Sequence, residues 1–320
     1  MTASSMLMPY GNLNSDQDRL IRGSTRYIPT MFEAGQTEDQ RYTLWRAFVD
    51  KLALELDLLF ARKWQENSIA SWSKSWIMLT NADLDIMQEF HAQRVLGRYA
   101  GSPDVIRRRN RDLFEIEDGL DDITSIVSLY VREAIPQWLN SQLQNTFSDR
   151  SANLMYLGNA HLILKSVFQR PRPYQSAFVL KRDSTLFDFL ASKLAYTPSF
   201  ISGHAIEFGL FFLVARSQLT SNEETNAVGI TCERLITDVG DRRVYAGVHY
   251  PSDNLASWLV LTRLLEYYAD TTQLRPIFWK ALQRSEVFHA ISKHVKEHSD
   301  SPLLAGHTAL VNAYKDCVSI

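Results

Sequence analysis

Hydrophobic residues recur at helical spacing from about residue 40 onward. Between residues 40 and 64 they lie on one face of a long amphipathic helix, and they are Leu44, Phe48, Leu52, Leu56 and Leu59. Asn81 is a residue type that often caps a helix N-terminus, and it precedes a second helical pattern that runs to about Tyr99. The inward positions of that second pattern are Leu84, Met87, Val95 and Leu96. The pattern therefore predicts two long helices in the first hundred residues.

The rest of the chain shows the same periodicity in separate stretches. Further helices are predicted for residues 121–147, 151–169, 184–194, 203–219, 222–240, 251–269, 272–297 and 308–316. No stretch of useful length alternates polar and apolar residues, and no Asn-Gly pair marks a hairpin. Residues 1–38 are rich in Ser, Asn, Gly, Thr and Pro and are predicted to form an irregular N-terminal arm. We therefore expect an all-α protein in which residues 39–320 form a single compact multi-helix domain.

Composition and charge restrict the possible partners. The 320 residues include 34 Lys and Arg against 36 Asp and Glu, which gives a net charge of −2 and no indication of a nucleic-acid partner. The two cysteines, Cys232 and Cys317, cannot form a disulfide framework and favour a reducing compartment. No apolar run approaches the roughly 20 residues of a membrane span, and no secretory signal is recognisable. We expect a cytoplasmic protein without a transmembrane segment, and the long apolar first helices are compatible with a homo-oligomer.

The first segment that carries chemistry is residues 165–173. Lys165 and Arg172 are seven residues apart, so two helical turns bring both cations to one side. Pro171 and Pro173 end the helix and hold the Arg172 guanidinium there. Arg170 is a competing cation, but its offset from Lys165 directs it away from that side.

The second segment is residues 198–205, which lead into an apolar helical run. Ser202 and Gly203 at the start of that helix offer backbone N–H donors and a hydroxyl to an anion, with His204 beside them. Glu207, one turn further on, either raises the pKa of His204 and keeps it protonated or points outward.

The third segment is residues 243–253. Pro251 is suited to the first position of a helix and places Asp253 in the first turn. His249, four residues before Asp253, is then within reach of its carboxylate, which fixes the imidazole tautomer. Arg243 supplies a third cation.

Together the three segments suit an oxyanion of tetrahedral or trigonal-bipyramidal geometry. Phosphoryl transfer needs positive charge around the equatorial oxygens, an in-line nucleophile and an acid for the leaving group. Two imidazoles can supply the nucleophile and the acid without a metal. His294 and His298 match the HxxEH pattern of a class of zinc peptidases. A zinc site of that class also needs a downstream Glu ligand, which the sequence does not contain, so this segment is interpreted as a solvated helix end.

The three segments resemble the KxxxxxxRP – PSGH – SRxxxxxHxxxD signature of the type 2 phosphatidic acid phosphatase and vanadium haloperoxidase superfamily. The similarity covers residues 165–253, within a motif-bearing core of about residues 150–270. It departs from the signature at Ile201, where Pro is usual, and at Arg242, where Ser is usual. The resemblance implies a helical-bundle core with the site at one end.

The resemblance also implies residue roles. His249 would be the nucleophile that becomes phosphorylated, Asp253 would orient it, and His204 would protonate the leaving oxygen. The residues implied to hold the phosphate oxygens are Lys165, Arg172, Ser202, Gly203 and Arg243.

Two reactions are compatible with such a site. The first is metal-independent hydrolysis of a small phosphomonoester or diphosphate through phosphohistidine, with no cofactor. The alternative is a haloperoxidase that holds vanadate on His249 and oxidises halide with peroxide. Haloperoxidases of this family tend to be considerably longer and to place an aromatic residue or His before SGH, where this chain reads Tyr196-Thr197-Pro198. These differences favour the phosphatase.

Overall fold

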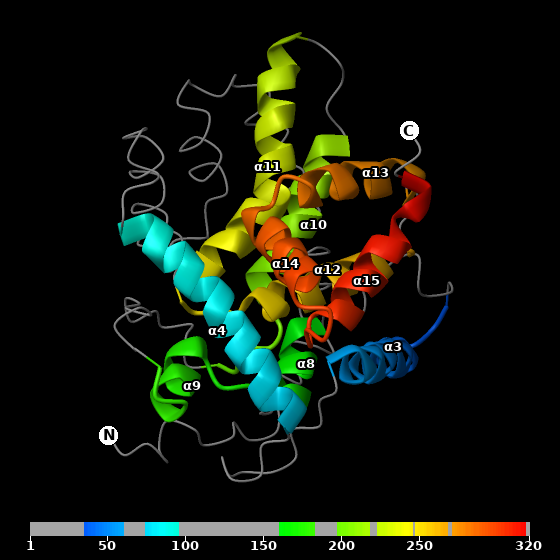
Figure 1. Cartoon of the computed structure of the whole chain (residues 1–320). Coiled ribbons are helices and arrows are strands. Elements are labelled where there is room, and N and C mark those ends of the chain that lie inside the picture. The colour runs from blue at the N-terminus through cyan, green and yellow to red at the C-terminus, as the bar shows by residue number, and fades with distance from the viewer. Residues whose placement is uncertain are drawn as a thin grey trace.

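The computed structural model describes residues 35–60, 74–95, 160–182, 197–217, 223–245, 247–267 and 271–317. These residues form helices and turns and contain no strand, which confirms the all-α fold. The helices, in chain order, are α3 (Glu38–Phe60), α4 (Lys74–Val95), α8 (Ala160–Phe168), α9 (Pro173–Val179), α10 (Gly203–Ser217), α11 (Glu223–Tyr245), α12 (Pro251–Leu265), α13 (Thr271–Leu282), α14 (Glu286–Glu297) and α15 (Leu304–Ala313), followed by the 3₁₀ turn η5 (Lys315–Cys317). Figure 1 shows their arrangement.

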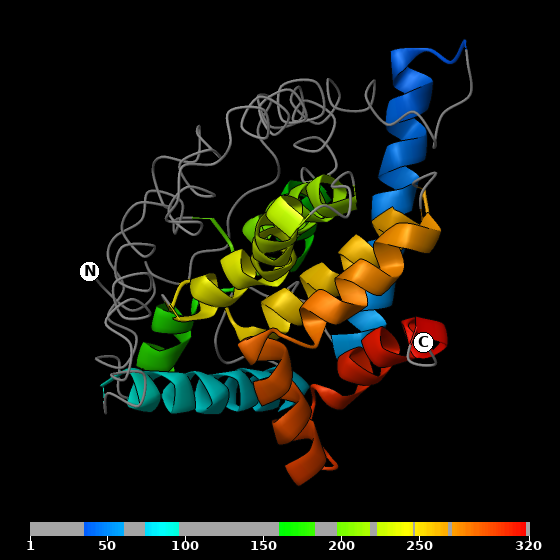
Figure 2. The ribbon, with the colours of Figure 1, turned by 90° about the horizontal axis from the view of Figure 1, so that it is seen from above.

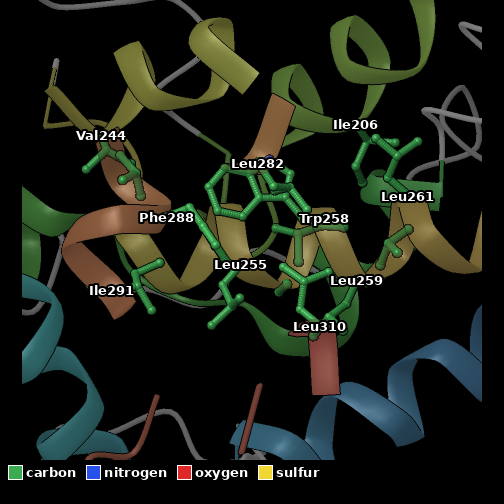
Figure 3. Close-up of a cluster of buried hydrophobic side chains, with 14 of the residues drawn as sticks. Ile206, Val244, Leu255, Trp258, Leu259, Leu261, Leu282, Phe288, Ile291 and Leu310 are labelled. Carbon is green, nitrogen blue, oxygen red and sulfur yellow. The ribbon is translucent and has the colours of Figure 1, made fainter. Parts of the chain in front are cut away.

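Helix α12 is the centre of the packing. All of its residues except Arg263 are buried, as expected of a helix that is surrounded on every side. Figure 3 shows Leu255, Trp258 and Leu259 of α12 among side chains from several other helices. Those neighbouring side chains are Ile206 of α10, Val244 of α11, Leu282 of α13, Phe288 and Ile291 of α14, and Leu310 of α15. Because α12 begins at Pro251, two residues after His249, this core fixes the position of the third motif.

The remaining helices pack around this centre. Helices α10 and α11 make the most extensive contact of any pair among the described elements. Helix α3 packs against α8 and α15, and helix α4 contacts α9, α11, α12 and α14. The two views in Figures 1 and 2 show α3 and α4 along different edges of the bundle. Helix α4 therefore reaches both α9, which directly follows the first motif, and α12, at whose start the third motif ends.

Several predicted helix boundaries are wrong. Helix α4 begins at Lys74, so Asn81 lies inside the helix and is not its N-cap. Leu79 is fully buried, and the burial of this apolar side chain offsets the lower helix propensity of the polar residues there. Helix α11 extends to Tyr245, so Arg242 and Arg243 lie in its last turn. Positive side chains are favourable at that end of a helix.

The predicted single helix 272–297 is two helices, α13 and α14. The break lies at Ser285, whose hydroxyl accepts a hydrogen bond from the backbone N–H of Phe288 and caps α14. The same hydroxyl donates to Asp241 of α11 at 2.8–2.9 Å. Asp241 is buried, so this contact ties the start of α14 to the body of the protein.

The predicted arm at 1–38 and the helices predicted for 121–147 and 184–194 lie wholly or largely outside the described residues, as does the first part of the helix predicted for 151–169, which is described only as α8. Helix α8 ends at Phe168, before Pro171 and Pro173, and Pro173 begins the short helix α9, which the sequence pattern did not indicate. In the part of the chain that the structure describes, none of the helices is both long enough and apolar enough to cross a membrane.

Candidate active site

The three motif segments meet at one place in the fold. The residues predicted to form the site all lie in described segments, and they are Lys165, Arg172, Ser202, Gly203, His204, Arg243, His249 and Asp253. They come from α8, the link between α8 and α9, the start of α10, the end of α11, and the start of α12 with the turn before it. Hydrogen bonds between these segments join residues as far apart in sequence as Arg172 and His249.

The turn between α11 and α12 positions His249. Gly247 has a φ of 74°, a conformation that side chains other than glycine's rarely allow. The backbone N–H groups of Val248 and His249 both donate to the Arg243 carbonyl at 3.1 Å, which closes the C-terminus of α11. The spacing between Arg243 and His249 is therefore set by a helix end followed by one tight turn.

The two ring nitrogens of His249 have different partners. Nδ1 lies 3.1 Å from Asp253 Oδ2, and Nε2 lies 3.1 Å from Nη1 of Arg172. A guanidinium only donates hydrogen bonds, and an ionised carboxylate only accepts them. The arrangement therefore assigns the proton to Nδ1 and the lone pair to Nε2. Burial first, and then the charge of Arg172, hold the pKa of His249 well below its usual range, against the opposing effect of Asp253.

Asp253 is a fully buried carboxylate with several donors. Its Oδ2 also accepts from the backbone N–H of Tyr250 at 3.0 Å, and its Oδ1 accepts from Arg170 at 2.7 Å. Burial by itself would raise the pKa of this carboxyl, but Arg170 and His249 outweigh burial and hold it below the usual value. Asp253 therefore remains charged beside the imidazole.

Lys165 and Arg172 both hold the loop that leads into α10. Arg172 donates from Nε to the Thr197 carbonyl at 2.7 Å and from Nη2 to the Thr197 hydroxyl at 3.0 Å. Lys165 Nζ donates to the carbonyls of Pro198 and Ser199. Burial, followed by the charge of Arg172, holds the pKa of Lys165 well below its ordinary value. An anion between these cations would relieve their mutual repulsion.

The start of α10 differs in part from the sequence prediction. The Ser202 hydroxyl accepts from the backbone N–H of Ala205 at 3.4 Å, and the Ser202 backbone N–H donates to Ser257 at 3.0 Å. The donor expected from the Ser202 backbone therefore already has a partner. At Gly203 an added Cβ would lie 2.9 Å from the ring of His161, so a larger residue would displace that ring.

His204 and Glu207 project from α10. The His204 ring stacks on Phe208 with a centroid distance of 5.9 Å. Burial first, and then the charge of Arg243, hold the pKa of His204 well below its usual range. Glu207 lies 3.3 Å from Nδ1 of His161, a residue that sequence reasoning did not select. The sequence feature that could have identified His161 is its position one turn before Lys165 on the same helix.

Burial and the charge of Lys165 shift the pKa of Glu207 in opposite directions. Burial raises its pKa to about 7, although the charge of Lys165 opposes this. Its contact is with His161, so the interpretation of Glu207 as the partner of His204 has no support in these distances.

The two other arginines near the motifs have separate partners. Arg242 forms an ion pair with Asp238 at 2.7 Å, one turn earlier on α11. Arg170 is fully buried and lies 2.7 Å from both Asp253 and Asp83. The interpretation of Arg170 as a cation directed away from the site is wrong, because it contacts the carboxylate that orients His249. Asp83, on α4, is the residue that sequence reasoning missed.

Anion binding should be accompanied by proton uptake. Because burial and neighbouring cations lower the pKa of His204, a bound dianion should raise that pKa and favour its protonation. Sulfate stays doubly ionised near pH 7, so calorimetric titration with sulfate in buffers of different ionisation enthalpy measures this uptake. We expect net proton uptake at pH 7, and His204→Asn should reduce it. The control is His289→Asn, since His289 is exposed on α14. Equal uptake in His204→Asn and the unmodified protein would contradict the prediction.

Comparison with known proteins gives one match. Residues 151–268 match the family model described as PAP2 superfamily. This range contains all three motif segments and excludes α3 and α4. No curated protein and no solved structure matches the chain.

Proposed function

We propose, from the match of residues 151–268 to the PAP2 superfamily model, that this protein is a phosphatase that acts through a phosphohistidine at His249. The observation that carries the proposal is the geometry of this imidazole. Asp253 holds Nδ1, which leaves Nε2 unprotonated. Nε2 accepts from Arg172 Nη1 at 3.1 Å, and Arg172 would turn this donor to the phosphate oxygens when Nε2 attacks. A neutral imidazole with an oriented lone pair next to a fixed cation is suited to attack on a phosphoryl group.

In the first step Nε2 of His249 attacks phosphorus, and the bond from phosphorus to the leaving oxygen breaks. Lys165, Arg172 and Arg243 would offset the charge on the equatorial oxygens, together with the N-terminus of α10. His204 would donate its proton to the leaving oxygen, which departs as an alcohol, or as a phosphate where the substrate is a diphosphate. The ring of His249 becomes cationic when it bonds phosphorus, and the charge of Asp253 stabilises that state.

In the second step water attacks the phosphohistidine. His204, now neutral, would take a proton from that water, and the bond between Nε2 and phosphorus breaks to release inorganic phosphate. The reaction thus returns His249 to its neutral form and His204 to its protonated form. Burial and then Arg243 lower the pKa of His204, so this role requires that the bound phosphate raise that pKa enough to protonate the ring.

The expected substrate is a small phosphomonoester or diphosphate. Lys165, Arg172 and Arg243 would offset the charge of the phosphoryl group, and the proposed reaction therefore does not call for a metal ion. The test is hydrolysis of p-nitrophenyl phosphate in the presence of EDTA, with a separate assay of bromide oxidation by peroxide in the presence of vanadate. We expect phosphate release that EDTA does not reduce. Bromide oxidation without phosphate release would overturn the proposal in favour of the haloperoxidase, and inactivation by EDTA that magnesium or zinc reverses would overturn its metal-independent form.

A further inference from the structure

A buried chain of charges connects α4 to the proposed nucleophile. Asp83 Oδ2 lies 2.7 Å from Nη2 of Arg170, and Nη1 of Arg170 lies 2.7 Å from Asp253 Oδ1. Asp253 Oδ2 in turn holds Nδ1 of His249. The side chains of Asp83, Arg170 and Asp253 are completely buried. Asp83 is thus linked to His249 although it lies outside the residues matched by the family model.

Ser252 provides a second connection. Its backbone N–H donates to Asp83 Oδ1 at 2.9 Å, and its hydroxyl donates to Asp83 Oδ2 at 2.5 Å. The same hydroxyl accepts from Nη1 of Arg170 at 2.6 Å. Asp83 therefore accepts from three donors. Burial raises the pKa of this carboxyl, and the charge of Arg170 and the hydrogen bonds from Ser252 and Arg170 oppose that rise. Asp83 also anchors the residue that immediately precedes Asp253 in the chain.

The sharing of Arg170 determines how much charge remains on Asp253. One guanidinium lies between two carboxylates, so the three groups together carry a net negative charge. Part of that charge is available to the imidazolium that forms when His249 bonds phosphorus. Without Asp83 the guanidinium would pair with Asp253 alone and neutralise it. The Arg170 guanidinium lies 3.5 Å from the centre of the Tyr250 ring, which helps to keep it in place.

We propose that Asp83 is a positioning residue for the nucleophile: through Arg170 and Ser252 it sets the place and the effective charge of Asp253, which orients His249. This inference rests on the proposed function of His249. It adds to the site a residue from α4, a helix that the three motifs do not include. Asp83 acts on turnover and not on phosphate binding, because it contacts none of Lys165, Arg172 and Arg243.

The test compares Asp83→Asn with Asp85→Asn. Asp85 lies two residues further along the same helix, is exposed, and pairs with Arg182 at the surface. With p-nitrophenyl phosphate as substrate, we expect kcat of Asp83→Asn to fall by about 10- to 100-fold, with KM and the inhibition constant of inorganic phosphate changed by less than about threefold. Asp85→Asn should keep the values of the unmodified protein. A loss confined to kcat separates positioning from general damage to the site.

Ser252→Ala supplies a milder version of the same test. It removes the hydroxyl between Asp83 and Arg170 and leaves every charge in place, so it remains informative if Asp83→Asn does not fold. Its kcat should fall by about 3- to 10-fold with KM unchanged. Unaltered kcat in folded Asp83→Asn, or in Ser252→Ala if the other variant does not fold, would overturn the inference. So would an equal loss of kcat and phosphate affinity. If the unmodified protein does not hydrolyse p-nitrophenyl phosphate, the proposed function fails instead.

Discussion

Replacing His249 with alanine is expected to abolish phosphate release while the protein stays folded. Removal of a covalent nucleophile should lower kcat by at least about a thousandfold. The fold should survive because Asp253 keeps its contacts with Arg170 and with the backbone N–H of Tyr250. The loss of one buried hydrogen-bonded group should cost about 1–3 kcal/mol of stability. The measurements are p-nitrophenyl phosphate turnover and a thermal melt.

A matched control and a trapping experiment complete this test. His289→Ala changes an exposed histidine on α14 and should leave turnover unaltered. Rapid quenching of the unmodified protein in base should trap a phosphorylated histidine, because phosphohistidine is stable in base and labile in acid. Near-normal turnover in His249→Ala, or a trapped phosphate on another residue, would refute the assignment of the nucleophile.

The second large effect concerns the arginine that lies beside Nε2 of His249. Vanadate adopts the five-coordinate geometry of the phosphoryl transition state, so its binding tests the anion-binding site that the cations are proposed to form. A charge-assisted hydrogen bond to a buried anion contributes about 1.5–3 kcal/mol. Arg172→Ala should therefore weaken vanadate inhibition by about ten- to a hundredfold. Arg182→Ala, which removes a partly exposed arginine paired with Asp85, should not weaken it.

Arg170→Ala should produce a different loss. It would leave the carboxylates of Asp83 and Asp253 buried without their shared cation, and such a change costs about 3–5 kcal/mol. The thermal melt of Arg170→Ala should therefore fall well below that of Arg172→Ala. If instead Arg170→Ala melts normally and loses more vanadate affinity than Arg172→Ala, the two arginines have been assigned the wrong roles.

The sequence was most informative where structure depends on residues close together in the chain. Lys165 and Arg172 were expected on one side of a single helix, but α8 ends at Phe168 and Arg172 lies in the link before α9, so helix periodicity does not explain their proximity. His249 and Asp253 follow from a helix start at Pro251, and the structure brings the two side chains within 3.1 Å. Such patterns are readable because helix geometry repeats every few residues. Helix ends were harder to predict from the sequence. The break at Ser285 is an example, because it depends on a contact with Asp241 from another helix.

By itself, then, the sequence determined that the protein is all-α and which motif residues meet at one site. Only the tertiary structure decided what surrounds them: the contact of Glu207 with His161, and the pairing of Arg170 with Asp83, which is 87 residues away in the chain. The contact of Asp83 has no local signature, because an Asp on a helix is usually exposed to solvent. A buried charge is stable only beside a partner of opposite charge. That partner is fixed by how the helices pack, so the role of Asp83 becomes visible only when α4 is placed against the start of α12.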